Sequence, residues 1–398
     1  MRIAMLHWAF PPIIGGVESH LALLCPRLVQ QGHTVSLVTA TAPGTLAYET
    51  WRGVAIRRSP LLDLNSLTPE LIEAKAVEIR RVMEDFLLDF RPDVVHAHNF
   101  HYFSFVHASA LQEICARHGW PLVLTAHNVW DDELWKRMNT LARGWDAVIA
   151  VSHYIRQELI VNGYPPERVV VVHHGIDDHA FQPPTALELQ NLYRAYPALR
   201  GRRVIFHPAR MSLAKGCDVS LRALDLIRRQ IPDALLVMAG TSNTVDWGQK
   251  QPAEILYINQ LIEELDLKDH VFVRFFPWFE MPQIYKGAEI CWYPSSFQEP
   301  FGLVMLEAMA SGKPIIVSRA GGMPEVVRPG YNGFLISPKD YEDLARYTIF
   351  LLHNPGIAAN IGQNGRRMVE EHFTVEIMTR ATLDVYQDTL GLLQAQTG

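Results

Sequence analysis

The stretch EPFGLVMLEAMASGKP occupies residues 299–314 and contains the start and the stop signals of one helix. Pro300 suits the first helical position, where an N–H group would have no partner, and Gly312 and Pro314 end the helix. The pattern therefore predicts a helix over about 300–311. Its first turn leaves unpaired N–H groups at the positive end of the helix dipole, which favours binding of phosphate or sugar oxygens. These groups belong to Phe301, Gly302, Leu303 and Val304.

Two carboxylates belong to the same stretch. Glu299 precedes the predicted helix and Glu307 lies about 12 Å further along its axis. Carboxylates at that spacing cannot act on one bond as an acid and base pair. They can hold two parts of an elongated ligand, such as the hexose and the ribose of a nucleoside diphosphate sugar. The alternative is an ordinary amphipathic helix, with Glu307 in solvent and Glu299 favouring the helix dipole.

A second pattern follows the apolar run at residues 204–206. Arg210 and Lys215 lie in a loop that ends in Gly216. Two cations in such a loop can converge on one diphosphate and neutralise the charge that grows when a phosphate leaves. The alternative is a pair of surface cations, but the position after a predicted strand and the glycine favour a function.

A glycine pair follows the first apolar run. Gly15 and Gly16 permit close approach of the backbone to a ligand, before a helix that is expected to begin near Val17. The loop does not have the spacing G-x-G-x-x-G, and the second predicted strand offers no acidic residue at its end for a ribose. A nicotinamide-dependent dehydrogenase is therefore disfavoured.

Short apolar runs alternate with helical patterns along the whole chain, which predicts an α/β fold with parallel sheets covered by helices on both faces. The length of 398 residues favours two cores. We expect two Rossmann-like domains, residues 1–178 and 185–374, whose sheets face each other across a cleft, with a C-terminal helix at about 375–398 packing back on the first domain. Ligands bind outside the carboxyl ends of parallel strands, so the cleft is the expected site.

The expected elements can be given by residue number. The strands of the first domain are residues 2–6, 34–39, 54–57, 94–96, 122–125, 147–151 and 169–172. The strands of the second domain are residues 204–206, 235–239, 271–275, 290–293, 314–318 and 333–336. Helical spacing of apolar residues is clearest over residues 18–31, 69–89, 104–117 and 357–396.

The composition excludes several classes of protein. With 48% apolar residues and a net charge of -6, the chain is an ordinary globular protein without a general attraction to nucleic acid. The four cysteines form no CxxC pair, so neither a disulfide framework nor a zinc knuckle is indicated. No apolar run approaches the roughly 18 to 20 residues that cross a bilayer. We expect a cytoplasmic protein with no transmembrane segment and no nucleic-acid partner.

Three histidines have a spacing that is compatible with a metal site: His96, His98 and His101. No neighbouring carboxylate or cysteine completes a ligand set, and His96 is expected at a buried strand end. Structural or hydrogen-bonding roles are therefore preferred over metal binding. His127 follows another predicted strand and is better placed to contact a sugar or an acceptor.

Together these segments resemble family 4 of the retaining glycosyltransferases, which have the GT-B fold. The resemblance extends over nearly the whole chain. Its most specific element is the Glu-x7-Glu block that continues into Ala-Met-Ala-Ser-Gly-Lys-Pro. The other matching segments, in chain order, are residues 15–16, 32–35, 93–98, 125–127, 210–215 and 321–325. The resemblance implies transfer of a hexosyl residue from a UDP- or GDP-hexose to a hydroxyl of a sugar-like or small-molecule acceptor. Of the two donors, the UDP-hexose is slightly preferred.

The resemblance also implies roles for single residues. Arg210 and Lys215 would bind the diphosphate, Glu307 the ribose hydroxyls, and Glu299 the donor sugar. The remaining donor contacts would come from Gly16, Phe276, Phe301, Gly302, Leu303 and Val304, with Phe276 in the region that borders the base. The acceptor contacts would come from Gly15, His127 and Trp130, the last in an aromatic and acidic loop at residues 130–135. The family generally works without a bound metal, so no metal or other cofactor is expected.

The expected mechanism is front-face substitution through an oxocarbenium-like transition state. The departing phosphate accepts the proton of the acceptor hydroxyl, while Arg210, Lys215 and the helix dipole stabilise the leaving group. Glu299 is expected to hold the sugar and His127 to lie near it. A covalent intermediate on Glu299 is the less favoured alternative, because a residue at a helix start approaches the ring from its edge.

The chain departs from the family pattern in three places: residues 173–177, residues 274–278 and the loop 241–247. Two alternative functions stay open, a GT-B nucleotide-sugar epimerase and a non-catalytic sugar-nucleotide binding protein. No carboxylates suited to elimination are found for the first, and Arg210, Lys215 and Glu299 are all present, which disfavours the second. Residues 69–89 mix acidic and basic side chains, so peripheral membrane contact is not favoured and a soluble acceptor is preferred.

Overall fold

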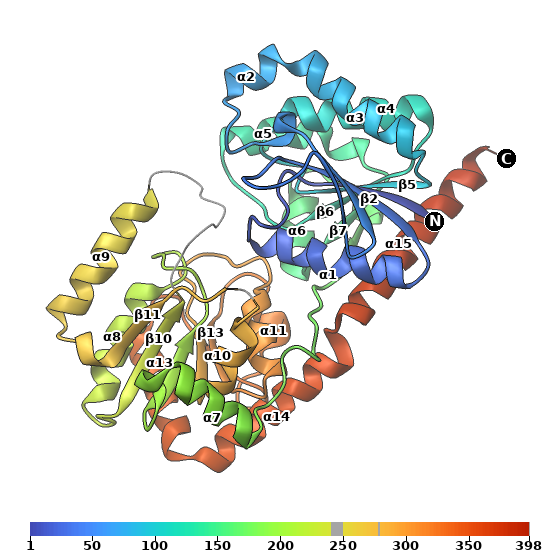
Figure 1. Ribbon diagram of the computed structural model, residues 1–398. Helices are drawn as coiled ribbons and strands as arrows, with labels where there is room; N and C mark the ends of the chain where they lie inside the picture. The colour runs from blue at the N-terminus through green and yellow to red at the C-terminus, as the bar shows by residue number, and fades with distance from the viewer. Residues whose placement is uncertain (240–249, 278, 398) are drawn as a thin grey trace. The chain divides into compact units, whose positions relative to one another are not determined.

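The computed structural model of the chain describes residues 1–239, 250–277 and 279–397 (Figure 1). Two features that depart from the family pattern, the loop 241–247 and Trp278, lie outside these residues. The chain divides into two compact units. Unit 1 consists of Met1–His174 and Val375–Gly398, and unit 2 consists of Gly175–Thr374.

Unit 1 is built on one sheet of eight strands, counted over its described residues, in the order β3-β4-β2-β1-β5-β6-β7-β8. Every neighbouring pair is parallel except β3 and β4. The strands are β1 (Arg2–Leu6), β2 (Thr34–Thr39), β3 (Tyr48–Trp51), β4 (Val54–Arg58), β5 (Val94–His98), β6 (Leu122–Ala126), β7 (Ala147–Ala150) and β8 (Val169–Val171). The central strands β5 and β6 are buried over their whole length, as apolar runs in a covered parallel sheet should be.

Helices connect these strands. They are α1 (Gly16–Gln30), α2 (Pro69–Ala74), α3 (Ala76–Phe90), α4 (Phe105–His118), α5 (Glu133–Met138), α6 (His153–Val161) and α15 (Val375–Thr397). In Figure 1 α3 and α4 lie on one side of the sheet, and α1 and α15 lie on the other. Ser104 and Ser152 cap α4 and α6 by accepting backbone N–H groups, which fixes where each helix begins.

The C-terminal helix α15 completes the core of unit 1. Met378 and Tyr386 belong to the same buried apolar cluster as Ile3 and Leu24. The hydroxyl of Tyr386 lies 2.6 Å from Nδ1 of His96 on β5. The last helix of the chain is therefore an integral part of the first unit.

Unit 2 contains a six-stranded parallel sheet over its described residues, in the order β11-β10-β9-β12-β13-β14. The strands are β9 (Arg203–His207), β10 (Ala234–Ala239), β11 (Val271–Arg274), β12 (Ile290–Tyr293), β13 (Ile315–Ser318) and β14 (Phe334–Ile336). Its helices are α7 (Ala186–Ala195), α8 (Cys217–Arg228), α9 (Lys250–Glu264), α10 (Met281–Gly287), α11 (Leu303–Ala310), α12 (Met323–Val326), α13 (Tyr341–His353) and α14 (Pro355–His372). Leu224, Leu236 and Trp292 lie in its main core.

Apart from shifts at the ends of elements, three differences separate the observed elements from the predicted ones. The edge strand β3 was not predicted, because its residues are exposed or half-buried and it is defined by antiparallel pairing with β4. The helix predicted over 69–89 is divided into α2 and α3 at Lys75. The helical region predicted over 357–396 is divided between α14 and α15, where Thr374 forms a β-bridge with Ile176.

Membrane-spanning helices need about 20 consecutive apolar residues. Among the helices of residues 1–239, 250–277 and 279–397, none combines sufficient length with sufficient apolarity to cross a membrane. The 23-residue helix α15, for example, carries Glu376, Arg380 and Asp384.

Candidate active site

The loop after β9 carries both predicted cations of unit 2. It leads from His207, the last residue of β9, to Gly216, which precedes α8. Gly216 has a φ of 78°, and a Cβ atom there would stand 1.9 Å from the carbonyl oxygen of Pro294. The N–H group of Ser296 also donates to the carbonyl oxygen of Ala214 at 2.9 Å. The loop therefore packs directly against the segment that follows β12.

Lys215 is held by two polar partners and one ring. Its Nζ donates to Oε2 of Glu299 and to the hydroxyl oxygen of Tyr293, each at 2.8 Å. The Tyr293 hydroxyl donates in turn to the same Oε2 at 2.7 Å. Nζ also lies 4.6 Å from the ring centroid of Phe297. The side chains of Lys215 and Glu299 are only 17% and 11% exposed, so this three-membered network is largely shielded from water.

The electrostatics of Tyr293 place Arg210 in the same region. Burial and the Glu299 carboxylate raise the pKa of Tyr293 well above its ordinary value, whereas the Arg210 guanidinium lowers it in part. Tyr293 therefore keeps its proton and acts as a neutral donor. Lys215 and Glu299, which the resemblance assigned to the donor, thus bond to a tyrosine that was not predicted, and the charge of Arg210 acts on the same hydroxyl. The available signal was its place at the carboxyl end of the predicted strand 290–293.

The helix predicted over 300–311 begins later than expected. α11 runs from Leu303 to Ala310, and Gly302 before it has a φ of 93°. The prediction that Pro300 occupies the first helical position is wrong, because the left-handed backbone of Gly302 interrupts the helix before Leu303. Phe301 is 1% exposed and lies 6.0 Å from the ring of Phe373, so packing holds the residues that precede the helix.

The later start changes the groups that can meet a ligand. A helix that begins at Leu303 leaves the N–H groups of Leu303 and Val304 without intrahelical acceptors, whereas Phe301 lies before the helix. Glu299 is not on the helix, so the predicted spacing between Glu299 and Glu307 along one axis does not apply. Both carboxylates nevertheless raise the pKa of the same Tyr293.

Glu307 lies on α11 and interacts with α10. Its Oε2 accepts a hydrogen bond of 2.8 Å from the Tyr285 hydroxyl. Burial raises the pKa of Glu307 to about 7, and the hydrogen bond from Tyr285 lowers it in part. Burial and the Glu307 carboxylate raise the pKa of Tyr285, so this hydroxyl stays protonated. A carboxylate accepts up to about four hydrogen bonds, so Glu307 can hold vicinal hydroxyls besides Tyr285.

Phe276, which was expected to border the nucleotide base, is part of an aromatic cluster in unit 2. Its ring centroid lies 5.6 Å from that of Tyr196 and 6.5 Å from that of Phe206, both in edge-to-face geometry. Only 5% of Phe276 is exposed, so the ring has little area left for stacking on a base. Its predicted contact with the donor stays a prediction.

The glycine pair of unit 1 lies at the start of α1. The helix begins at Gly16, one residue before the expected start near Val17, and Gly15 precedes it in an extended conformation. A Cβ atom on Gly16 would meet no atom within 4 Å. Packing among the described residues therefore does not require glycine at this position, and the backbone stays open to close approach. The predicted contact of Gly16 with a phosphate stays a prediction.

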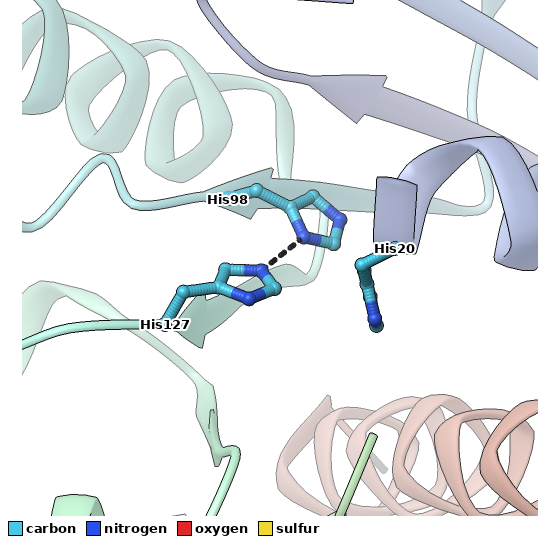
Figure 2. Close-up of side chains that lie close together, drawn as sticks. All are labelled: His20, His98 and His127. Atoms are coloured by element: carbon cyan, nitrogen blue, oxygen red, sulfur yellow. Dashed lines mark hydrogen bonds between the residues drawn. The ribbon is translucent and has the colours of Figure 1, made fainter. Parts of the chain in front are cut away.

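His127 follows β6 and lies in a group of buried histidines of unit 1. Figure 2 shows His98 and His127 side by side, with His20 next to them. Nε2 of His127 lies 3.1 Å from Nδ1 of His98. Its backbone N–H group donates to Oδ1 of Asn99 at 2.8 Å. Burial lowers the pKa of His127 well below its ordinary value, so the imidazole is neutral at neutral pH.

Two of the three histidines of the sequence pattern, His96 and His101, bond to other groups in the structure. The ring nitrogens of His96 lie 2.6 Å from the Tyr386 hydroxyl and 2.7 Å from the Thr125 hydroxyl. His101 donates through Nε2 to the carbonyl oxygen of Asn128 at 2.8 Å. Of the three, only His98 is grouped with His127. His20 and His98 were missed as partners of His127 because they come from α1 and β5, far from it in the chain.

Trp130 belongs to an aromatic surface of unit 1. Its ring stacks on Tyr102 with centroids 3.8 Å apart and an angle of 5°, and it meets Phe103 edge to face at 5.2 Å. The Tyr102 hydroxyl donates to Asp132. Trp130 and Tyr102 are half-buried, so each keeps part of its surface in solvent. A small pocket beside this surface is lined by Trp8, Leu62, Leu64, Asn99, Phe100, Tyr102, Ser104 and His107.

Comparisons with known proteins cover both units. The family model of glycosyl transferases group 1 matches residues 191–368, and the model of glycosyltransferase family 4 matches residues 14–180. An uncharacterized glycosyltransferase of Methanocaldococcus jannaschii is 28% identical over 409 aligned residues, which cover 99% of this chain and 100% of the relative. Glycogen synthase of Mycobacterium tuberculosis is 27% identical over 417 aligned residues, covering 97% of this chain and 94% of the synthase.

A solved structure is similar over the whole chain. The crystal structure of Anabaena HepE in complex with UDP and glucose has a TM-score of 0.80 at 21% sequence identity. The match covers 98% of this chain and 100% of the HepE chain. At this level of identity the likeness shows a shared fold.

Proposed function

The chain belongs to the family 4 glycosyltransferases, which have the GT-B fold, and from this premise we propose that it is a retaining hexosyltransferase. It transfers a hexosyl residue from a nucleoside diphosphate hexose to a hydroxyl of an acceptor. The observation that carries this proposal is the arrangement of Lys215, Tyr293 and Glu299 with Arg210 nearby, at the carboxyl ends of β9 and β12.

We assign the donor to unit 2. The diphosphate carries charge that Arg210 and Lys215 can neutralise, and the N–H groups of Leu303 and Val304 at the helix start can donate hydrogen bonds to phosphate oxygens. Glu307 holds the ribose hydroxyls. It is a half-buried carboxylate, and besides the hydrogen bond from the Tyr285 hydroxyl it can accept further hydrogen bonds from a ligand. The proposal also includes the donor contacts that the resemblance implies for Gly16 and Phe276.

The proposed chemistry needs no protein nucleophile. The bond between the anomeric carbon and the phosphate oxygen breaks, the acceptor oxygen attacks from the same face, and its proton passes to the departing phosphate. Lys215 and Arg210 stabilise the negative charge that develops on the phosphate. The Glu299 carboxylate already accepts hydrogen bonds from Lys215 and Tyr293, which favours a role in holding groups over attack on the sugar.

UDP-glucose is the donor to test first. HepE, which shares the fold, was crystallised with UDP and glucose, and a GDP-hexose is the second choice. For the acceptor we assign the aromatic surface formed by Trp130 and Tyr102, together with Gly15 and His127. Aromatic rings with exposed area can stack on the apolar face of a sugar ring. The acidic residues Asp131, Asp132 and Glu133 beside them can accept hydrogen bonds from hydroxyl or amino groups.

The experiment measures nucleotide release from UDP-glucose and from a GDP-hexose, with and without a panel of sugar acceptors. Release that requires an acceptor, with an α-linked product from an α-linked donor, supports the proposal. An altered donor sugar without any acceptor would instead indicate an epimerase. Tight donor binding with no release under any condition would indicate a binding protein. Either of these two outcomes overturns the proposal.

A further inference from the structure

Four buried imidazoles meet in unit 1, from four different segments. His20 lies on α1, His98 ends β5, His127 follows β6 and His174 follows β8. The ring centroid of His20 lies 4.9 Å from those of His127 and His174, and the centroids of His98 and His127 are 5.4 Å apart. We call these four residues the histidine cluster. None of them is more than 7% exposed.

The cluster leaves ring nitrogens unsatisfied. Nε2 of His20, Nε2 of His98 and Nδ1 of His127 are buried and have no hydrogen-bond partner within the part of the chain that the structure describes. Buried polar atoms in folded proteins nearly always have a partner. The unpartnered Nε2 of His20 belongs to the same cluster as Nδ1 of His98 and Nε2 of His127, which face each other. This grouping of buried ring nitrogens indicates a ligand that imidazole binds.

The spacing of the nitrogens fits a metal ion. Nδ1 of His98 and Nε2 of His127 are 3.1 Å apart. Two nitrogens bound to one tetrahedral Zn²⁺ at 2.0 to 2.1 Å stand about 3.3 Å apart. One ring nitrogen from each of His20, His98 and His127 can be chosen so that all three lie within 4.8 Å of one another. His20, His98 and His127 can therefore supply a three-histidine set, which is a known ligand set for zinc.

The surroundings hold these rings in place. Nδ1 of His174 lies 3.0 Å from Nδ1 of His20, which orients His20 and leaves its unpartnered Nε2 as the ligand atom. The ring of His96, fixed by hydrogen bonds to Tyr386 and Thr125, lies 4.1 Å from the ring of His98. The ligands are therefore preorganised by neighbours that do not bind the ion themselves.

The surroundings of the cluster also suit a cation. The buried carboxylate of Glu18 is linked to the cluster through His7. One ring nitrogen of His7 lies 3.0 Å from the Glu18 carboxylate, and the other lies 3.0 Å from the His98 carbonyl oxygen.

We propose that His20, His98 and His127 bind one Zn²⁺ ion, with His174 orienting His20. The sequence pattern had argued against a metal because it considered His98 with His96 and His101, whereas the structure groups His98 with residues from other segments. The proposal concerns unit 1 alone and does not depend on the transferase activity. Zinc ligation would occupy the imidazole of His127, so zinc is expected to inhibit any transfer reaction in which that imidazole contacts a substrate.

The test measures metal binding by the full chain after removal of metals with a chelator. Co²⁺ is titrated while the visible absorption is recorded, and Zn²⁺ is titrated in competition with a chromophoric chelator. We expect one equivalent of Co²⁺ with the intense visible bands of a low-coordinate nitrogen site, displaced by Zn²⁺. His98→Gln should weaken binding at least about 100-fold, and His174→Gln, which removes only an orienting contact, about 10- to 100-fold.

Matched variants separate this site from other histidines. His107→Gln removes a buried histidine of the same unit that bonds to the Leu61 carbonyl oxygen, and His118→Gln removes an exposed one that pairs with Glu84. Both should bind Co²⁺ like the unaltered chain. Melting curves of the metal-free variants show whether each variant folds. If His98→Gln does not fold, the same titration is made with His20→Asn. Absence of the visible bands at excess Co²⁺, or their full retention in folded His98→Gln and His20→Asn, would overturn the proposal.

Discussion

Nζ of Lys215 lies 2.8 Å from Oε2 of Glu299, and this contact joins the loop after β9 to the segment after β12. The two strands are neighbours in the sheet, so their carboxyl ends bring the two charges together. In the absence of a donor, the ammonium group of Lys215 and the carboxylate of Glu299 therefore neutralise each other. A diphosphate must therefore compete with Glu299 for Lys215, and the carboxylate becomes available to sugar hydroxyls as the cation turns to phosphate.

Lys215→Ala should lower kcat by about 100- to 1000-fold, because it removes a cation that stabilises the leaving phosphate. Initial rates with saturating donor and acceptor measure the effect. Lys268→Ala is the matched control, since Lys268 is an exposed lysine of the same unit that pairs with Glu263 at 2.5 Å. A loss of less than threefold in Lys215→Ala would remove Lys215 from the chemical step.

Donor binding should weaken below neutral pH. The pKa of Glu307 in the free protein is about 7, and the ionised form is the one that accepts ribose hydroxyls. The dissociation constant should therefore be about tenfold higher at pH 6 than at pH 8. Calorimetric titration with UDP at several pH values measures this. Glu307→Gln should abolish the dependence, whereas Glu289→Gln, which removes a carboxylate paired with Arg203, should retain it.

Tyr285→Phe should shift this pH dependence upward. The Tyr285 hydroxyl donates to Glu307 and lowers its pKa, so its removal raises the pKa above about 7. Binding of UDP should then weaken at pH 7 and recover at pH 9. The same calorimetric titrations give the new midpoint. Tyr331→Phe, at a half-exposed ring of the same unit, is the control, and an unchanged midpoint in Tyr285→Phe would contradict the assignment.

Glu307→Gln should stabilise the fold at alkaline pH. The pKa of Glu307 is about 7 in the folded chain and near 4.5 when exposed, so the folded state binds more protons between these values. Stability from this group is present below pH 4.5 and is lost as the pH rises through 7. At pH 8 the variant should therefore gain about 1 to 3 kcal/mol in the free energy of unfolding. Urea titrations at pH 8 and at pH 5 should show the gain largely at pH 8.

Gly216→Ala should destabilise unit 2 strongly. The new Cβ atom would stand 1.9 Å from the Pro294 carbonyl oxygen, at a φ of 78°. Gly330 offers a close match, because its φ is 75° and a Cβ there meets no atom within 4 Å. Gly330→Ala should cost about 1 kcal/mol from backbone strain alone, and Gly216→Ala at least about 3 kcal/mol. Equal costs by urea unfolding would show that the contact with Pro294 is unimportant.

Local patterns predicted most of the strands. β1, β2 and β12 have the predicted bounds, because a strand buried in a parallel sheet is a short, largely apolar run that the sequence shows directly. The start of α11 was not predictable in this way. Pro300 suits a helix start, but the positive φ of Gly302 and the burial of Phe301 against Phe373 depend on tertiary packing.

Residue types and their spacing along the chain were enough to predict the alternating α/β architecture and to propose Arg210, Lys215, Glu299 and Glu307 as candidates, because these are local properties. Which side chains meet depends on the tertiary fold. Tyr293 joins Lys215 to Glu299, Tyr285 meets Glu307, and His20 meets His98, His127 and His174. The physical reason is that parallel strands bring the carboxyl ends of distant segments to one edge of a sheet, and no periodicity along the chain records those distances.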